Sequence, residues 1–335
     1  MIVSRTPFRV SLFGGGTDYP AWFRQHGGMT IGGSINKYCY ISLRYLPPFF
    51  DHKYRIVYSK IERPNHLKDI DHPSVRETLR YLDINEGIEL HHYADLPART
   101  GLGSSSAFTV GLLNSACGLR NESKSAKWLA ETATHIEQNL MHESVGNQDQ
   151  TMVAQGGFGR LVFQTDGSVQ QEKLTSTERI HQLESNLMLF YTGLSRLSDK
   201  NAQKISHGVV STNLGTQLID IAEAAWKILS DSSASLDNLA PLLTEGWKLK
   251  RSLADSISTP EIDEVFERAL QAGALGGKLL GAGGGGFLLF YVPQDRQEQV
   301  KQSLADKLLV SFRFENQGSV VFSSSEVSSR GVPKD

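Results

Sequence analysis

The sequence predicts a two-lobed protein that combines strands and helices. Its length of 335 residues exceeds what one compact hydrophobic core usually organises, which favours two lobes with a cleft between them. Apolar residues make up 39% of the chain and charged residues 21%, the composition of a globular protein. Strand-like apolar runs and helical spacing of apolar residues both occur in each half. We place the boundary near residues 180–190 and expect domains over 1–185 and 186–335.

The charge balance and the cysteine content exclude several classes of protein. The chain has 34 Lys and Arg against 36 Asp and Glu, a net charge of −2, so no basic domain for nucleic acid is indicated. Cys39 and Cys117 lie in a strand-like and a helix-like run and are expected to be reduced core residues. The N-terminus lacks the apolar core of a signal peptide, and no later apolar run approaches 18 residues. We expect a cytoplasmic protein with small-molecule partners and no membrane contact.

The first half begins with a strand that stops at three glycines. In "PFRVSLFGGG" the apolar residues Phe8, Val10 and Leu12 alternate with Arg9 and Ser11, so Arg9 is expected to point away from the core. Further strands are predicted within 35–46, 53–60 and 87–97, and helices within 64–84, 106–119 and 126–142.

The second half is predicted to carry more helix than strand. Strands are expected at "LMLFY" and "FLLFYV", helices near 200–230, 236–255 and 261–272, and a last helix with one or two short strands at the end. A glycine cluster, "GGKLLGAGGGG", precedes the second of these strands.

The stretch "PARTGLGSSSAF" has the pattern of an anion-binding turn. A glycine-rich turn that opens a helix at serines presents unpaired backbone amides, and the helix dipole favours negative charge there. The pattern lacks the lysine of a P-loop and the third glycine of a dinucleotide-binding loop. A dinucleotide pattern does occur at Gly281, Gly283 and Gly286, but it leads into a strand. Glycines can also serve tight turns alone, yet three clusters, at 14–16, 101–103 and 281–286, favour ligand binding.

Two carboxylates stand out near this stretch. Serine hydroxyls beside a phosphate site suit Mg²⁺, which takes oxygen ligands and often a carboxylate. Glu137 lies on or beside the apolar stripe of its predicted helix, where it is either a ligand or an edge residue that reaches solvent. Asp149 lies in the polar turn "GNQDQ", where it is either functional or a simple turn residue.

Three stretches in order resemble the motifs of the GHMP small-molecule kinases, named for galactokinase, homoserine kinase, mevalonate kinase and phosphomevalonate kinase. They are "TPFRVSLFGGGTDY", "PARTGLGSSSA" and "KLLGAGGGGF". The resemblance covers nearly the whole chain. It implies a two-lobed α+β fold with a ribosomal S5 domain-2-like N-terminal lobe, a ferredoxin-like C-terminal lobe, and ATP and substrate between them.

The resemblance also implies roles for single residues. Asp149 would act as base or orient the acceptor hydroxyl, and Arg9 would lie beside it, although a structural salt bridge is the alternative for Arg9. Ser105 and Glu137 would bind Mg²⁺, with Ser104 and Ser106 as substitutes for the serine. The ATP phosphates would contact Pro97, Gly101, Leu102, Gly103, Ser104, Ser105 and Ser106. The substrate would contact Gly14, Gly15, Gly16, Thr17, Asp18, Arg196, Gly283, Gly284 and Gly285. For Asp18, a cap of the following helix is the alternative.

Within the family, the details are most similar to the branch that phosphorylates D-glycero-D-manno-heptose 7-phosphate. The supporting stretches are "GGGTDYPAWF", "GGMTIGGSINKYCYI" and "GALGGKLLGAGGGGFLLFYV". A fucokinase, a galactokinase-like enzyme and a non-catalytic sensor of sugar and nucleotide are the alternatives. A phosphate on the acceptor needs a cation, and the candidates are Lys37, Arg99, Arg160, Arg196 and Lys278, with Arg196 preferred. Each of these is alternatively a solvated surface charge, and a homodimer is compatible with the sequence.

Overall fold

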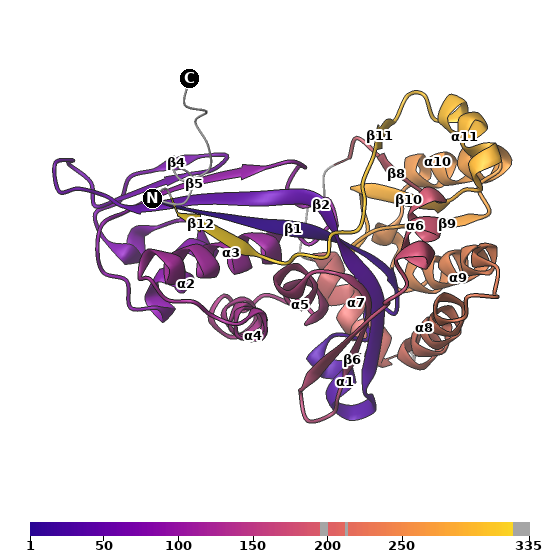
Figure 1. Cartoon of the computed structure of the whole chain (residues 1–335), viewed down its shortest axis with the longest axis horizontal. Coiled ribbons are helices and arrows are strands. Elements are labelled where there is room, and N and C mark those ends of the chain that lie inside the picture. The colour runs from indigo at the N-terminus through magenta and orange to yellow at the C-terminus, as the bar shows by residue number, and fades with distance from the viewer. Residues whose placement is uncertain (195–199, 212–213, 324–335) are drawn as a thin grey trace, which may run out of the picture.

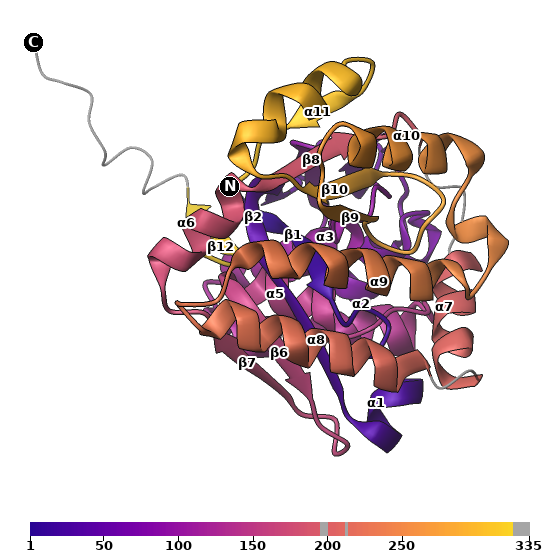
Figure 2. The ribbon, with the colours of Figure 1, turned by 90° about the vertical axis from the view of Figure 1, so that its right-hand side faces the viewer.

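The computed structural model describes residues 1–194, 200–211 and 214–323, and it contains two sheets with helices packed on them (Figures 1 and 2). The first sheet runs in the order β12 (Val320–Ser323), β1 (Ile2–Phe13), β2 (Gly28–Tyr45), β5 (Ile88–Ala94), β3 (Tyr54–Val57) and β4 (Ile61–Glu62). A hairpin of β6 (Phe158–Phe163) and β7 (Val169–Lys173) extends it through β2. All pairings are antiparallel except that of β3 with β5.

Strand β2 organises the first sheet because it is long enough to have different partners at its two ends. Its first part pairs with β6 over Gly28–Gly33, and its second part pairs with β5 over Cys39–Tyr45. Along its other edge it pairs with β1, where Arg9 faces Ser34. The hairpin β6–β7 is absent from the sequence-based prediction, which is therefore incomplete here.

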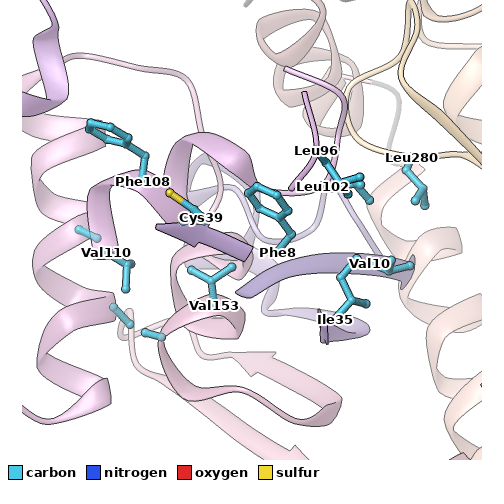
Figure 3. Packing of buried hydrophobic residues seen from close by; sticks show 14 of the residues in the cluster. Phe8, Val10, Ile35, Cys39, Leu96, Leu102, Phe108, Val110, Val153 and Leu280 are labelled. Atoms are coloured by element: carbon cyan, nitrogen blue, oxygen red, sulfur yellow. The ribbon is translucent and has the colours of Figure 1, made fainter. Parts of the chain in front are cut away.

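Helices cover one face of the first sheet (Figure 1). They are α2 (Pro73–Tyr81), α3 (Ser104–Leu119), α4 (Ala126–His135) and α5 (Gln148–Gln155). Helix α3 contacts β1, β2 and the other three helices, and most of its residues are buried, as its nearly continuous apolar sequence requires. Figure 3 shows Phe8, Val110 and Val153 within this layer. Two further helices are α1 (Pro20–His26) and α6 (Thr177–Ser185), and a 3-10 turn, η1, spans Leu67–Asp69.

The second sheet has four antiparallel strands in the order β11 (Leu308–Val310), β8 (Leu187–Tyr191), β10 (Phe287–Tyr291) and β9 (Gly276–Leu279). Its strands follow the chain as strand, helices, two strands, helix and strand, which is the ferredoxin-like arrangement predicted for this lobe. The helices are α7 (Lys200–Ser211), α8 (Leu214–Ser230), α9 (Leu239–Arg251), α10 (Pro260–Gln271) and α11 (Gln297–Ser303). Figure 2 shows α8 and α9 side by side. The 3-10 turns are η3 (Leu236–Asn238), η4 (Asp255–Ile257) and η5 (Gln294–Arg296).

Both faces of the central strands of this sheet are buried, which explains their uninterrupted apolar sequences. Met188 and Phe290 belong to one hydrophobic cluster, whereas Leu189 and Leu289 belong to the other. That second cluster also contains Val10 and Leu102 of the first lobe. A strand with two buried faces has no polar side to alternate with, and "LMLFY" and "FLLFYV" accordingly show none.

The chain returns to the first lobe at its end. Phe314 forms a bridge with Ile35, and β12 then pairs with the edge of β1. A cut after residue 185 would therefore leave one strand of the first sheet in the C-terminal part, and the exact domain limits stay a prediction. The lobes also meet where a Cβ on Gly286 would lie 2.2 Å from the carbonyl oxygen of Thr100, an approach that glycine permits. Among the described residues, no helix is long and apolar enough to span a bilayer.

Candidate active site

The glycine–serine loop ends directly at the start of helix α3. Gly103 is the residue before the helix and adopts the left-handed conformation, with φ of 73°. The backbone amide of Ala107 donates to the carbonyl of Gly103, and no side chain caps the helix. The amides of Ser104, Ser105 and Ser106 consequently face the loop at the positive end of a 16-residue helix, which is the arrangement that binds phosphate.

Arg9 and Asp149 form a two-point ion pair beside this loop. Nε of Arg9 donates to Oδ1 of Asp149 over 2.8 Å, and Nη2 donates to Oδ2 over 2.6 Å. Nη1 donates to the carbonyl of Gly101 over 2.7 Å, and the Arg9 backbone amide donates to the carbonyl of Leu102 over 3.0 Å. One arginine therefore fixes the carboxylate and the loop together.

The elements that bring this pair together are β1 and α5. Arg9 lies on β1 with its side chain 5% exposed, while Asp149 lies in the first turn of α5 and is 25% exposed. The sequence predicted a polar turn at Asp149, and this is wrong because the helix already begins at Gln148. Gly103 is packed against the pair, since a Cβ there would lie 3.0 Å from Cγ of Arg9.

Asp18 is a buried carboxylate that lines the same cavity as Asp149. Its Oδ1 accepts from the amide of Gly16 over 3.0 Å, and its Oδ2 accepts from the amide of Gln148 over 3.4 Å. Burial raises the pKa of Asp18 to about 6, and the nearby charge of Asp149 adds to the rise. Helix α1 begins after Tyr19 without a side-chain cap, so the alternative of Asp18 as a helix cap is wrong.

Glu137 is buried behind the start of α3, in a π-helical turn, η2 (Ile136–Leu140), that continues α4. Its Oε2 accepts from the hydroxyl of Ser106 over 3.0 Å and from the side-chain amide, Nε2, of Gln150 over 2.5 Å. Oε1 has no hydrogen-bond partner in the described part of the chain. Burial raises the pKa of Glu137 to about 7, although the hydrogen bond from Gln150 acts to lower it. The alternative in which Glu137 reaches solvent is wrong, because none of its surface is exposed.

The second lobe contributes two lysines. Lys278 on β9 is 9% exposed, and its Nζ donates to the carbonyl of Leu12 on β1 over 2.6 Å. Burial lowers the pKa of Lys278 to about 7, and the positive charge of Arg9 lowers it further. Lys250 on α9 donates to the carbonyl of Gly281 in the third glycine cluster.

These groups surround a cavity of about 310 Å³ between the lobes, at the lower end of the usual size of ligand pockets. Of the predicted site residues, those that line it are Arg9, Gly15, Gly16, Asp18, Gly101, Gly103, Ser104, Ser105, Ser106 and Asp149. Four basic residues line it as well, namely Arg9, Arg99, Lys250 and Lys278.

Other predicted residues lie away from the cavity wall. Pro97, Gly14, Leu102, Thr17 and Glu137 do not line it; the carbonyls of Pro97 and Gly14 accept the hydroxyls of Thr100 and Thr17. Gly283, Gly284 and Gly285 pack against Ile257, Asn201 and Leu194, while Gly281 and Ala282 of the same cluster face the cavity.

The predicted metal ligands and phosphate partners are only partly brought together. Ser106 contacts Glu137, whereas Ser105 is exposed and no bond to Glu137 is seen. Of the predicted cations, Arg99 and Lys278 line the cavity, Arg160 pairs with Glu172 on β7, and Lys37 does not line it. Arg196 lies outside the described residues.

Sequence reasoning missed several residues of the cavity wall, among them Gln148 and Lys250. Gln148 accepts from the hydroxyl of Ser11 over 2.9 Å and thereby ties α5 to β1. Lys250 lies in the last turn of α9 among other basic residues, and the sequence does not show which of them faces the cavity. The cluster "GNQDQ" singled out the first region but gave no reason to separate Gln148 from its neighbours.

Comparison with known proteins shows which family has these two domains. Residues 72–157 match the N-terminal domain of GHMP kinases, and residues 228–309 match their C-terminal domain. The D-glycero-alpha-D-manno-heptose 7-phosphate kinase of Campylobacter jejuni is 25% identical over 90% of this chain and 93% of its own length.

Solved structures show the same fold. One described as a D-glycero-D-manno-heptose 1-phosphate kinase from Bacteroides thetaiotaomicron has a TM-score of 0.71 and 23% identity, covering 96% of this chain and 99% of that one. Lactococcus lactis galactokinase complexed with galactose has a TM-score of 0.72 and 17% identity, covering 95% of each chain. The family-model matches, in both lobes and in order, show that this chain is a member of the GHMP kinase family.

Proposed function

We propose that the protein is an ATP- and Mg²⁺-dependent sugar kinase that phosphorylates the anomeric hydroxyl of D-glycero-D-manno-heptose 7-phosphate. The product would be the 1,7-bisphosphate, a precursor for nucleotide-activated heptose and surface polysaccharide. The observation that carries the proposal is the two-point pair of Arg9 with Asp149, which lies on the wall of the same cavity as the glycine–serine loop. Membership of the GHMP family supports the use of ATP.

Asp149 is the group placed to receive the acceptor hydroxyl. Each of its oxygens accepts one bond from Arg9, and a carboxylate oxygen has a further lone pair, so a hydroxyl can donate to it from the cavity. In the reaction, the hydroxyl oxygen bonds to the terminal phosphorus of ATP while the bond from that phosphorus to the bridging oxygen breaks. ADP leaves, and the hydroxyl proton passes to Asp149. Positioning and charge neutralisation supply most of such a rate enhancement.

Arg9 gives this carboxylate a fixed direction. Its guanidinium is held by Gly101 on one side and by Asp149 on the other, so the loop that would bind the phosphates and the group that would bind the acceptor share one anchor. A fixed geometry of this kind lowers the entropic cost of bringing acceptor and phosphate together.

Ser106 and Glu137 fit a magnesium ion better than Ser105 and Glu137 do. Oε1 of Glu137 is buried without a partner in the described residues, and the Ser106 hydroxyl both contacts Glu137 and lines the cavity. Oxygen donors with room for water and phosphate oxygens are the set that Mg²⁺ prefers. When bound, the ion would neutralise phosphate charge, and a metal would also offset the cost of ionising Glu137 in its buried position.

Asp18 is suited to a sugar hydroxyl. Its carboxylate lines the cavity and is held by two backbone amides, which leaves lone pairs for hydroxyl donors. Because Asp18 and Asp149 face one cavity, a sugar held by Asp18 would present another hydroxyl to Asp149.

The identity of the sugar rests on similarity rather than on pocket shape. The Campylobacter jejuni relative is named for heptose 7-phosphate, and the Bacteroides thetaiotaomicron structure is described for heptose 1-phosphate. An L-fucokinase/L-fucose-1-P guanylyltransferase of Bacteroides fragilis is also 26% identical over 90% of this chain, which keeps another sugar-1-kinase as the second candidate.

A panel of acceptors tests the proposal. Purified protein is incubated with ATP, Mg²⁺ and each of heptose 7-phosphate, heptose 1-phosphate, fucose, galactose and mannose, and the products are identified by ³¹P NMR. We expect a new anomeric phosphate signal with heptose 7-phosphate. Turnover of a free hexose without turnover of the heptose phosphate would replace the substrate, and ATP binding without turnover of any acceptor would favour the sensor.

A further inference from the structure

Lys278 is a buried lysine that has no carboxylate partner in the described part of the chain. It lies on β9 of the second lobe, lines the cavity, and is 9% exposed. Within the described residues, none of the ion pairs includes it. Its ammonium group donates a hydrogen bond to the carbonyl of Leu12. A buried charge of this kind is costly unless a partner arrives.

The charges around Lys278 indicate the sign of that partner. The positive charge of Arg9 on β1 repels that of Lys278, and Lys250 on α9 lines the same cavity. One carboxylate of the cavity wall, Asp149, is already held at both oxygens by Arg9. The remaining carboxylates on the cavity wall are Asp18 and Glu143. Neither of them figures among the charges that shift the pKa of Lys278.

We propose that Lys278 is a phosphate-binding residue of the cavity and that its ammonium group contacts a phosphate of the bound ligand. An ammonium group has three donors, and the bond to Leu12 uses one, so two remain for phosphate oxygens. Arg9 uses three of its five donors on Asp149 and Gly101, and its charge is already paired with a carboxylate. Lys278 is the cation of the two that has no carboxylate partner in the described residues and can offer its charge to an incoming anion.

This inference rests on the proposed function for the source of the phosphate. Either a nucleotide phosphate that ADP also carries or the phosphate that the sugar already carries would satisfy Lys278. The contact to Leu12 joins β9 to β1, so in both cases the phosphate would be bound where the two lobes meet.

The binding test uses inorganic phosphate, ADP, heptose 7-phosphate and phosphate-free heptose as separate probes in titration calorimetry. The variants are Lys278→Met, which removes the charge, and Lys278→Arg, which keeps it. Lys127→Met is the matched control, because the Lys127 side chain is 75% exposed and only loosely paired with Glu131 at 3.8 Å. Loss of one charge-assisted bond is expected to weaken the affected probe about 10- to 100-fold in Lys278→Met, with partial recovery in Lys278→Arg.

The pattern of losses identifies the source of the phosphate. Weaker inorganic phosphate and ADP binding with unchanged sugar phosphate binding assigns Lys278 to the nucleotide. Weaker heptose 7-phosphate binding with unchanged phosphate-free heptose binding assigns it to the acceptor. Unchanged affinity for every anion, with or without a lower melting temperature, would overturn the inference. Inorganic phosphate and ADP require no particular sugar, so a wrong substrate assignment leaves this outcome readable.

A second measurement follows the proton that Lys278 would take up. At pH 8 a lysine with a pKa of about 7 is mostly neutral, and a bound phosphate raises that pKa, so the protein takes up a proton on binding. An incoming anion would also raise the pKa of the buried carboxyls of Asp18 and Glu137, so the uptake that belongs to Lys278 is the part that disappears in Lys278→Met. Calorimetry of ADP in buffers of different ionisation enthalpy should show uptake approaching about one proton. The absence of uptake for both ADP and heptose 7-phosphate would contradict the proposal.

Discussion

At the scale of single residues, some charged groups of the site have a full set of partners and others do not. Arg9 and Asp149 satisfy one another with two bonds, while Glu137 and Lys278 are buried with less than full compensation. Uncompensated buried charge costs stability, and proteins retain it where a ligand later provides the partner. The buried groups that lower the stability of the folded protein lie in or beside the cavity, and this indicates that the cavity is the functional site.

Replacement of Asp149 by Asn is expected to reduce kcat by ~10² to 10⁴, because the side chain no longer accepts the hydroxyl proton. Nucleotide affinity should change by less than about 10-fold, since the amides of the α3 terminus are untouched. Steady-state kinetics and ADP titration measure both quantities. Arg9→Lys is the companion variant: a single ammonium cannot make both bonds to Asp149, and kcat should fall while Asp149 itself remains. Full turnover by Asp149→Asn would rule out its role.

Replacement of Asp18 by Asn is expected to stabilise the ligand-free protein and to impair sugar binding. The folded protein holds a proton on Asp18 up to a pH of about 6, whereas the unfolded chain loses it near 3.8, so stability falls as the pH rises through that window. Ionised Asp18 costs roughly 3 kcal/mol at pH 8, and Asn avoids this cost but loses part of the bonding to Gln148. A net gain of about 1 to 2 kcal/mol is expected at pH 8 and little at pH 4.

Urea unfolding at the two pH values measures this difference. Asp166→Asn is the control, because Asp166 is exposed and the bond from the Ser168 amide lowers the pKa of its carboxyl, the opposite direction. An equal gain for Asp18→Asn at pH 4 and pH 8 would show that its charge is not the cause.

At the scale of elements, the site is made where secondary structures end. The N-terminus of α3, the first turn of α5 and the end of β1 meet there, and each contributes backbone groups as well as side chains. Gly103 holds these ends together, since its left-handed conformation turns the chain into α3 and its missing side chain leaves room for Arg9.

Gly103→Ala is therefore expected to lower both stability and nucleotide affinity. A methyl group would lie 3.0 Å from Cγ of Arg9 and 3.5 Å from Oδ2 of Asp149, at a φ of 73° that alanine avoids. A loss of about 1 to 3 kcal/mol in unfolding free energy is expected, with ADP binding at least about 10-fold weaker. Gly246→Ala is the matched control: in α9 its added methyl meets nothing within 4 Å, and it should stabilise by about 0.5 to 1 kcal/mol. Equal effects of the two variants would contradict this account.

The sequence predicted the elements whose patterns are local and missed those that depend on partners. The alternation around Arg9 and the glycine–serine stretch before α3 identified β1 correctly as a strand and the glycine–serine loop correctly as a helix start. The pairing of β6 with β7 and the direction of the Lys250 side chain toward Gly281 depend on neighbouring segments of the folded chain. The pattern of a single sequence carries no information about such neighbours. The pairing of Ser106 rather than Ser105 with Glu137 likewise depends on how α3 and η2 are rotated relative to one another.

At the scale of the whole molecule, the two lobes share one hydrophobic cluster. Val10 and Leu102 of the first lobe belong to the same cluster as Leu280 and Leu289 of the second, and Figure 3 shows Leu102 and Leu280 in this region. Polar contacts also cross the junction, among them the bond from Lys278 to Leu12. A shared core makes separate unfolding of either lobe expensive.

We therefore expect the lobes to unfold together. Hydrogen exchange in rising urea should give the same opening free energy for Val10 in β1 and Leu289 in β10, within about 1 kcal/mol. ADP with Mg²⁺ should raise both values equally, because a ligand that binds between the lobes stabilises the shared native state. Two separate transitions, with one lobe unaffected by ADP, would mean that the lobes are independent.

A crystal structure of the protein with a non-hydrolysable ATP analogue, Mg²⁺ and heptose 7-phosphate tests the central claim most directly. The account predicts that the amides of Ser104, Ser105 and Ser106 bind the phosphates and that the terminal phosphate faces a sugar hydroxyl within hydrogen-bond distance of Asp149. A triphosphate bound elsewhere, or an acceptor hydroxyl remote from Asp149, would contradict it.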